Sequence, residues 1–440
     1  MPLRCLLLIV QWLAYVMCSA NLRELWSYSG IDFSTPSPLR VFLSLLLLIA
    51  VAALLPQRVD TPSKGAVWFI ATFLVVPTIA VAAVNPQYDF ETKILSVLTV
   101  MIGLPVVVAV TRVGKPIAVA PTGLLSPGAF YALLVALTCV AIATVVFGYG
   151  LSGFNIGFDD AYARRAVART LANPFPGSGY LITWIKQPLS ILLVTVALQW
   201  RRSSGLVLAV IASLALFSLT GEKTAAFMVP FAWLCFVVYR RELRHGSNIP
   251  WWGIMNTGLV AIPAVIGKFF PGSEIDYMLT RRMGLDPAIL THEYVLVATN
   301  DGFTFFSQGL LKWLATGDDR QSIGYRVGEI LTPGAGQNAN ANAWADGYVS
   351  AGIVGVVITS ILVGLVMRVA DGLAASRDVL VAGVTLAVTL KVFVDGYFHT
   401  AILTGGVLAG LLLIWVMPTG PEYPRWGQEV RDARATRIPP

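Results

Sequence analysis

Long uninterrupted runs of apolar residues limit most strongly what this chain can fold into. Twelve runs follow one another along the sequence, with most charged residues in the gaps between them. Each run has about 16 to 22 residues, the length that a helix needs to cross a bilayer. The expected spans lie near residues 5–20, 41–56, 66–84, 94–111, 128–149, 180–200, 204–219, 223–239, 251–267, 347–369, 378–395 and 400–418. We therefore predict an all-α integral membrane protein with about twelve transmembrane helices in a single polytopic domain.

The composition agrees with this prediction and excludes other classes. Of the 440 residues, 56% are hydrophobic and only 12% are charged, whereas soluble proteins carry roughly 25% charged residues. The four cysteines lie inside apolar runs, with neither a disulfide framework nor zinc spacing. The net charge of +7 comes from basic residues scattered one to three per loop. This pattern sets membrane orientation and does not indicate nucleic-acid binding.

The distribution of Lys and Arg predicts the orientation in the membrane. With the N-terminus inside, the inner segments carry more than twice as many basic residues as the short outer segments. The prediction is a multi-pass membrane protein with the N-terminus and a tail at 419–440 in the cytoplasm. The first apolar run also resembles a cleavable signal peptide, ending in Cys18-Ser19-Ala20. Its removal would leave the rest of the topology unchanged.

Two long segments fall on the predicted outer side, at residues 150–179 and 268–346. The longer one contains amphipathic stretches at Ile275–Leu285 and Tyr294–Leu314, which favour a small helical cap against the membrane face. Long structured loops on a rigid scaffold often carry function. We therefore expect the functional site at this side of the membrane.

Arginine clusters in these outer loops are the first candidate site residues. They are Arg281 and Arg282 in the longer loop, and Arg164, Arg165 and Arg169 in the shorter one. On a helix, Arg165 and Arg169 share a face. Guanidinium groups bind phosphate oxygens bidentately and stay charged at physiological pH, so a lipid-linked diphosphate is the expected ligand. The alternative is that they pair with Asp159, Asp160, Asp276 or lipid head groups.

Three lysines lie at or within predicted spans. Lys186 falls inside the sixth span and Lys223 in the turn Gly221-Glu-Lys-Thr224, and both are candidates for substrate binding or for snorkelling to the interface. The turn lacks the Gly-Lys pair and preceding strand of a phosphate-binding loop, which excludes nucleotide binding there. Lys391 and Asp395 are one helical turn apart and are expected to form an ion pair.

The string Gly336-Gln-Asn-Ala-Asn-Ala-Asn-Ala-Trp-Ala-Asp-Gly-Tyr348 is the most distinctive pattern in the chain. Asn338, Asn342 and Asp346 recur every four residues, so in a helix they would form one polar stripe. That stripe could bind sugar hydroxyls or bury against neighbouring helices. His292, Glu293 and Asp276 are candidates for a general base. The three histidines are far apart in sequence, and clustered metal ligands are missing.

The Asn-Ala repeat followed by Trp-Ala-Asp-Gly-Tyr348 and Ser350-Ala-Gly-Ile-Val-Gly355 resembles a signature of the bacterial oligosaccharide repeat-unit polymerases, the O-antigen (Wzy-type) family. Leu219–Ala225 and the Arg281-Arg282 pair ahead of Tyr294 are similar to further parts of that family, so the resemblance covers most of 150–400. It implies a GT-C-like fold and a metal-independent membrane glycosyltransferase without cofactor.

The resemblance also implies partners and roles. The substrate would be an undecaprenyl-diphosphate-linked oligosaccharide, and the partners would include membrane lipids and a chain-length regulator protein, with no nucleic acid. Arg281, Arg282, Arg164 and Lys223 would bind the lipid diphosphate. The stretch after His292 departs from the family's aromatic run near Tyr294, which leaves the acceptor side and any base open.

The expected function is polymerisation of these repeat units into O-antigen or exopolysaccharide at the outer face of the inner membrane. One alternative is an O-antigen ligase-type transferase, which shares the architecture but uses a lipid acceptor. Another is a polytopic transporter or lipid flippase, which the number of spans permits. The 80-residue outer loop argues against a compact alternating-access carrier.

Overall fold

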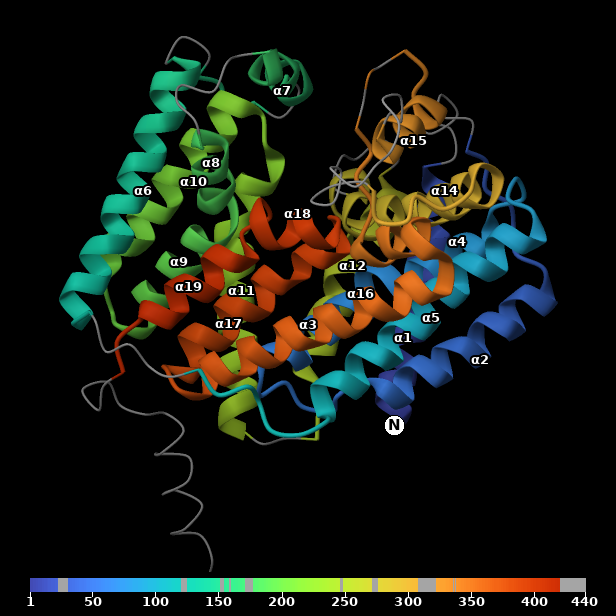
Figure 1. Ribbon diagram of the computed structural model, residues 1–440, viewed down its shortest axis with the longest axis horizontal. Helices are drawn as coiled ribbons and strands as arrows, with labels where there is room; N and C mark the ends of the chain where they lie inside the picture. Colours follow the sequence, from blue (N-terminus) through green and yellow to red (C-terminus); the bar gives the residue numbers. More distant parts are fainter. Residues whose placement is uncertain are drawn as a thin grey trace, which may run out of the picture.

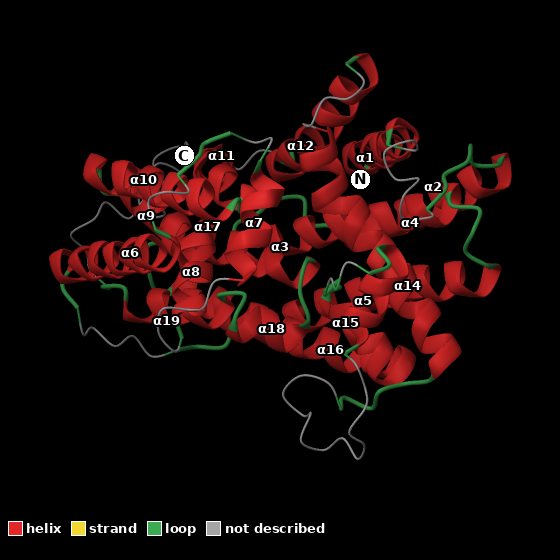
Figure 2. Cartoon of the chain, turned by 90° about the horizontal axis from the view of Figure 1, so that it is seen from above, coloured by secondary structure: helices red, strands yellow, loops and turns green. Residues whose placement is uncertain are grey.

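The computed structural model describes residues 1–22, 31–119, 125–150, 154–157, 160–170, 177–245, 248–270, 276–307, 322–334, 336 and 338–419. Within these residues every regular element is a helix (Figures 1 and 2). The predicted all-α fold is therefore confirmed. The predicted cytoplasmic tail, apart from residue 419, lies outside the described residues.

The helices follow the apolar runs. In chain order they are α1 (Pro2–Asn21), α2 (Pro38–Leu54), α3 (Pro62–Ile70), η2 (Ala71–Val75), α4 (Val76–Val84), α5 (Phe90–Arg112), α6 (Pro127–Tyr149), α7 (Ala161–Thr170), α8 (Ser178–Trp184), η3 (Ile185–Leu189), α9 (Ser190–Gln199), α10 (Ser203–Thr220), α11 (Lys223–His245), α12 (Trp251–Phe269), η4 (Tyr277–Leu285), α14 (Asp286–Asp301), α15 (Ile323–Leu331), α16 (Ala343–Ala375), α17 (Val379–Leu390), η6 (Lys391–Val394), α18 (Phe398–Leu403) and α19 (Val407–Val416).

Ten helical segments in the described part of the chain are long and apolar enough to cross a membrane. Two further predicted spans correspond to shorter apolar helices, Pro38–Leu54 and Val379–Val394. The protein is thus a multi-pass helical membrane protein. Short polar or proline-containing segments separate the helices, and caps such as Asp89 at the start of α5 and Ser126 at the start of α6 fix their first turns.

Two spans are interrupted near their middle by wider helical turns. The segment η2 ends two residues before Pro77, and η3 contains Pro188. Proline lacks the N–H that an α-helix uses and its ring clashes with the carbonyl four residues earlier. A π-bulge relieves this conflict and leaves a weak point in the helix. Both spans are nevertheless buried on most sides.

The helix α16 is a hairpin and not a straight rod. Ala351 and Gly352 have non-helical dihedral angles, with φ of +60° at Gly352. The Trp344 indole N–H donates to Ser360 Oγ at 3.0 Å, although these residues would be about 24 Å apart along one straight helix. Gly355 lies so close to Gly347 that a Cβ at Gly355 would sit 1.9 Å from the Gly347 carbonyl oxygen. The segment 343–350 therefore folds back along 353–375.

The interruptions meet at one level inside the bundle. The Lys391 ammonium lies 5.6 Å from the centre of the Phe73 ring in η2. Val392 contacts Gly405, and Gly406, with φ of +88°, packs against Pro188 of η3. The segments η2, η6, 405–406 and η3 therefore contact one another in this order across the protein.

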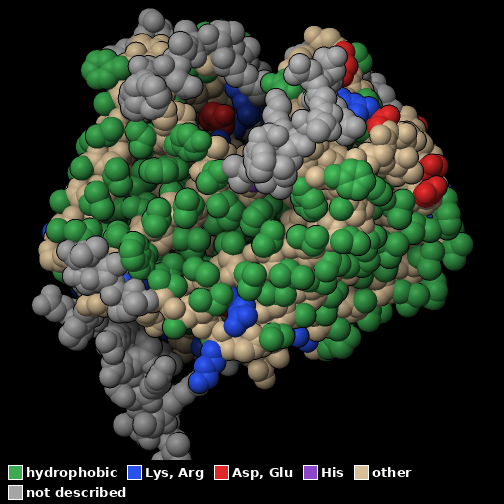
Figure 3. All heavy atoms as spheres, in the orientation of Figure 1, with side chains coloured by type: hydrophobic (Ala, Val, Ile, Leu, Met, Phe, Trp, Pro, Cys, Tyr) green, Lys and Arg blue, Asp and Glu red, His purple; other side chains and the backbone are tan. Residues whose placement is uncertain are grey.

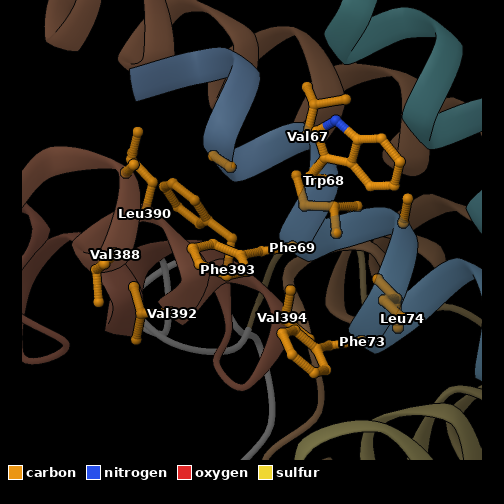
Figure 4. Packing of buried hydrophobic residues seen from close by; sticks show 14 of the residues in the cluster. Val67, Trp68, Phe69, Phe73, Leu74, Val388, Leu390, Val392, Phe393 and Val394 are labelled. Carbon is orange, nitrogen blue, oxygen red and sulfur yellow. The ribbon is translucent and has the colours of Figure 1, made fainter. Parts of the chain in front are cut away.

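The main core lies between α3–η2 and α17–η6, which run side by side (Figure 4). Trp68, Phe69, Phe73 and Phe393 are among its fully buried aromatic side chains. A second, smaller core joins α6, α7, η3, α10 and α11. Burial of these side chains holds the central helix α17, whose residues from Leu380 to Leu390 are all buried.

Arginine side chains bind helix ends at the side of the bundle where the N-terminus lies, here called the basic end (Figure 1). The last carbonyls of a helix lack partners within it, and arginines supply donors. The contacts are Arg4 to Leu55 O, Arg58 Nη2 to Leu243 O at 3.0 Å, Arg112 Nη2 to Leu54 O at 2.9 Å and Arg377 Nε to Ile414 O at 3.2 Å. The predicted spans, with the N-terminus inside, place all four of these arginines on the inner side.

Candidate functional site

The opposite side of the bundle, here called the loop end, carries the helices of the two predicted outer segments. Helix α7 stands on one side and α14 and α15 on the other, with α18 between them (Figure 1). Figure 3 shows a hollow at this end in which acidic and basic side chains gather. The structure thus brings helices α7 and α14, which are more than 100 residues apart in sequence, to the same end of the protein.

One charged group at the loop end is centred on Glu222, in the turn between α10 and α11. Arg165 of α7 approaches it with 3.6 Å between Nη2 and Oε1, and Lys186 of η3 with 3.4 Å between Nζ and Oε2. All three side chains are partly exposed, between 23% and 32%. Two cations from separate segments therefore share one carboxylate in contact with solvent. We call these three residues the Glu222 triad.

Close backbone packing positions this triad. Gly221 ends α10 with φ of +68°, and a Cβ there would lie 2.0 Å from the carbonyl oxygen of Ala161, the first residue of α7. Only glycine allows α7 to sit on the turn at this distance. The neighbouring Arg164 donates to Gly157 O at 2.6 Å and lies 5.5 Å from the centre of the Phe217 ring.

A second charged group joins η4 to the start of α14. Arg281 Nε contacts Asp286 Oδ1 at 3.0 Å, and Arg282 Nη1 contacts Asp286 Oδ2 at 2.9 Å. The Arg281 side chain is only 10% exposed, whereas that of Arg282 is 50% exposed. Asp276, one of the alternative partners considered for these arginines, accepts from Asn21 Nδ2 at 3.1 Å. Arg281 is thus bound into the fold, and Arg282 is the member that solvent reaches.

The third group is buried on α14. The rings of Tyr88 and His292 stack with 4.9 Å between centroids, and Tyr88 Oη donates to Glu293 Oε1 at 2.7 Å. His292 Nδ1 faces Ala288 O at 2.9 Å. Among the described residues, His292 Nε2 and Glu293 Oε2 have no hydrogen-bond partner. Burial lowers the pKa of His292 to about 4 and raises the pKa of Glu293.

The candidate residues on the η4–α14 run do not form one site. Arg281 and Glu293 are twelve residues apart on a continuous helical run, so roughly 15 to 18 Å separates them. A base on Glu293 could not reach a phosphate held by Arg281 within hydrogen-bond distance. The predicted phosphate ligand Arg281 and the predicted base Glu293 therefore do not meet at one point.

The Asn-rich string does not form the helical stripe that its spacing suggested. Residues 338–342 are not helical, and Asn342 caps the start of α16, where its Oδ1 accepts from Trp344 N and Ala345 N at 3.1 and 3.0 Å. Its Nδ2 donates to Thr291 Oγ1 at 2.8 Å. The prediction of one stripe is wrong because a capping side chain satisfies the first backbone N–H groups of the helix that follows.

The other members of the string lie around Tyr397, in the turn before α18. Tyr294 Oη donates to Ala339 O at 2.8 Å and is hydrogen-bonded to Tyr397 Oη. Asn338 lies against Gly324 of α15 and near the same tyrosine, and the partly buried Asp346 faces the backbone N–H of Phe398. Burial raises the pKa values of both tyrosines, so both hydroxyls act as donors at neutral pH.

Two predictions about lysines and arginines remain. The expected Lys391–Asp395 ion pair is confirmed, with 2.6 Å between Nζ and Oδ2. Lys223 opens α11 beside Glu222. Arg169 lies on α7 as expected, but its side chain and Asp159 are outside the described residues.

Sequence reasoning missed Glu222, Tyr88 and Tyr397. Each acts through a partner at least 36 positions away in sequence, so local spacing carried no signal for the contact. The Gly-Glu-Lys-Thr turn was singled out in the sequence, but its lysine and not its glutamate was predicted to be functional. In the described part of the chain, no group of three or more His, Cys, Asp or Glu side chains could hold a metal ion.

Comparisons with models of known families, with curated proteins and with solved structures found no match to this chain.

Proposed function

We propose that the protein is a twelve-span, GT-C-like inner-membrane transferase that polymerises oligosaccharide repeat units carried on undecaprenyl diphosphate. The loop end would face outward, in agreement with the distribution of Lys and Arg in the sequence. The observation that carries the proposal is the Glu222 triad, in which Arg165 of α7 and Lys186 of η3 converge on one carboxylate at the loop end. The sequence resemblance to O-antigen polymerases supplies the reaction.

The geometry of the triad suits an exchangeable anion. Charge-assisted N–H···O contacts are usually about 2.7 to 2.9 Å, whereas both contacts to Glu222 are longer, at 3.6 and 3.4 Å. A diphosphate carries more charge and more acceptor oxygens than one carboxylate. It can therefore replace Glu222 as the shared partner of both cations, with the neighbouring Arg164 on the same helix within reach of additional phosphate oxygens.

In the proposed reaction, an acceptor hydroxyl attacks the anomeric carbon of the donor glycan. The carbon–oxygen bond to the diphosphate breaks, and the polyprenyl diphosphate leaves with the electron pair. Arg165 and Lys186 stabilise the charge that develops on it, which needs no cofactor. The acceptor proton passes to a carboxylate. Asp346 is the candidate because it is partly accessible next to α18, whereas His292 and Glu293 are buried.

A ligase and a transporter are the two alternative functions. A ligase would use the same cations and differ in its acceptor. A transporter is favoured by one structural feature, the interrupted helices η2, η3 and α16, because broken spans often line substrate sites in carriers. Neither alternative requires a donor and an acceptor that are both lipid-linked repeat units.

Reconstituted vesicles containing one lipid-linked repeat unit test the proposal. Wild-type protein should produce a ladder of polymer, and Lys186→Gln should abolish it. Arg326→Gln is the matched control, because Arg326 pairs with Asp301 at the same end but away from the triad, on α15. Transfer only to a lipid A core acceptor would show a ligase, and movement of the lipid without new glycosidic bonds would show a transporter.

A further inference from the structure

A groove runs along the outer face of the bundle between α6 and α10, at its basic end. It has a volume of about 570 Å³. Helix α6 contributes Tyr131, Val135 and Cys139, which recur every four residues and so share one face. Helix α10 contributes Ser203, Ser204, Val207, Leu208 and Ile211. Figure 1 shows both helices at the edge of the molecule, away from the hollow at the loop end.

The groove is polar at one end and apolar along the rest of its length. Tyr131 Oη and Ser204 Oγ are hydrogen-bonded at 2.8 Å, and Ser203 opens the first turn of α10 beside them. Farther along, Val207 and Ile211 are 57% and 50% exposed. A molecule that fits this groove has a polar head at the basic end and an apolar chain that follows the helices.

Arginines surround the polar end. Arg202 stacks over the Tyr131 ring with 5.7 Å between its guanidinium carbon and the ring centre. Arg201 adopts φ of +55°, which turns the chain sharply between α9 and α10. Arg240 of α11 lies within electrostatic range of Arg201 and Arg244. The charge of such guanidinium groups stabilises an anion placed beside them.

The carboxylate of Asp378, which Gln199 links to the end of α9, has its own hydrogen-bond partners. Asp378 accepts from Gln199 Nε2 at 3.2 Å and caps the first turn of α17 through Leu380 N and Val381 N. Asp378 therefore satisfies the start of α17. Groups of basic residues at the ends of membrane helices attract the anionic head groups of lipids.

We propose that this groove is a binding site for an anionic phospholipid, with its phosphate at Arg201 and Arg202 and an acyl chain along Val207 and Ile211. The site lies at the other end of the protein from the Glu222 triad and is independent of the proposed transferase activity. Charge complementarity selects the head group, and the apolar lining selects a lipid over a free phosphate. A bound lipid would lie in the surface groove between α6 and α10.

Native mass spectrometry of the purified protein with phosphatidylglycerol or phosphatidylcholine tests this proposal. The wild-type protein should retain phosphatidylglycerol preferentially. Each arginine near a membrane surface changes the affinity for an anionic lipid about fivefold, so Arg201→Gln with Arg202→Gln should weaken retention of phosphatidylglycerol roughly 30-fold. Arg112→Gln is the matched control, since it removes an exposed arginine at the same end, far from the groove.

A second variant separates the head-group contact from the groove. Val207→Trp fills the groove at an exposed position that tolerates a larger side chain, and should reduce retention of both lipids. An unchanged preference for phosphatidylglycerol in the double arginine variant would overturn the proposal. So would a change from dimer to monomer in Val207→Trp with no loss of lipid, because the groove would then be an interface between two copies.

Discussion

The substitution Gly103→Ala tests whether the first segment of α16 folds back into the bundle. Gly103 lies inside α5, and a Cβ there would sit 2.3 Å from Cδ1 and 2.5 Å from Nε1 of Trp344. Trp344 cannot move aside easily, because it is 1% exposed and its indole N–H is held by Ser360. The added methyl group must therefore displace the hairpin or shift α5.

Two opposing effects set the expected magnitude. Replacing glycine by alanine inside a helix gains roughly 0.5 to 1 kcal/mol. Overpacking a filled core costs typically about 1 to 3 kcal/mol, and more when the neighbour is rigid. An approach of 2.3 Å falls far inside the ordinary contact distance between carbon atoms. The clash should win, so we expect a net loss of about 2 kcal/mol in stability.

Thermal denaturation in detergent measures this loss. Gly128→Ala on α6 is the control, because nothing lies within 4 Å of a Cβ at that position. The control should match or slightly exceed the wild-type melting temperature, and Gly103→Ala should fall several degrees below it. Adding Trp344→Leu to Gly103→Ala should cost less than the two single changes together. Equal melting temperatures for the two alanine variants would refute the hairpin.

Two further predictions concern α14 and its start. Burial lowers the pKa of His292 to about 4, so this histidine takes up a proton more readily in the unfolded chain than in the folded protein. The stability of the fold should therefore fall as the pH drops from about 6.5 toward 4, by up to about 3 kcal/mol. His292→Gln should flatten this part of a melting-temperature profile, and an unchanged profile would contradict the burial of His292. Burial raises the pKa of Glu293, so this residue has the opposite effect: it lowers stability as the pH rises above about 4.5. Arg281→Ala should lower the free energy of unfolding by about 3 kcal/mol, because it breaks a buried ion pair. Arg282→Ala should lower it by at most about 1 kcal/mol, because Arg282 shares Asp286 but is half exposed. Chemical denaturation compares the two variants, and equal losses would contradict the difference in burial.

The predicted spans emerged from the sequence because bilayer thickness imposes one length on every crossing helix. The apolar runs near 66–84, 94–111 and 128–149 correspond closely to described helices. The π-bulges could be suspected from Pro77 and Pro188, since proline disturbs any helix. The hairpin in α16 could not, because Gly352 sits in an unbroken apolar run and its turn depends on contacts with other helices.

The candidate site was predictable only in part. Clusters of arginine in the outer loops directed attention to the loop end, and Arg165 and Lys186 do meet there. Glu222 was missed because packing brings it to Arg165 and Lys186 from other elements. Asp286 was missed although it follows Arg282 by four residues, a spacing that favours an ion pair on a helix. Amphipathic patterning also failed to predict that α14 is buried. Its polar residues contact protein as its apolar residues do, since Glu293 is hydrogen-bonded to Tyr88 and Thr291 to Asn342.

Binding of a soluble polyprenyl diphosphate analogue, such as farnesyl diphosphate, tests the central claim most directly. Titration calorimetry with the purified protein should give at least tenfold weaker binding for Lys186→Gln and for Arg165→Gln than for the wild type, and Glu222→Gln should bind more tightly because the competing carboxylate is gone. The control Arg326→Gln should bind like the wild type. Equal affinity in all five proteins would contradict the assignment of the Glu222 triad as the diphosphate site.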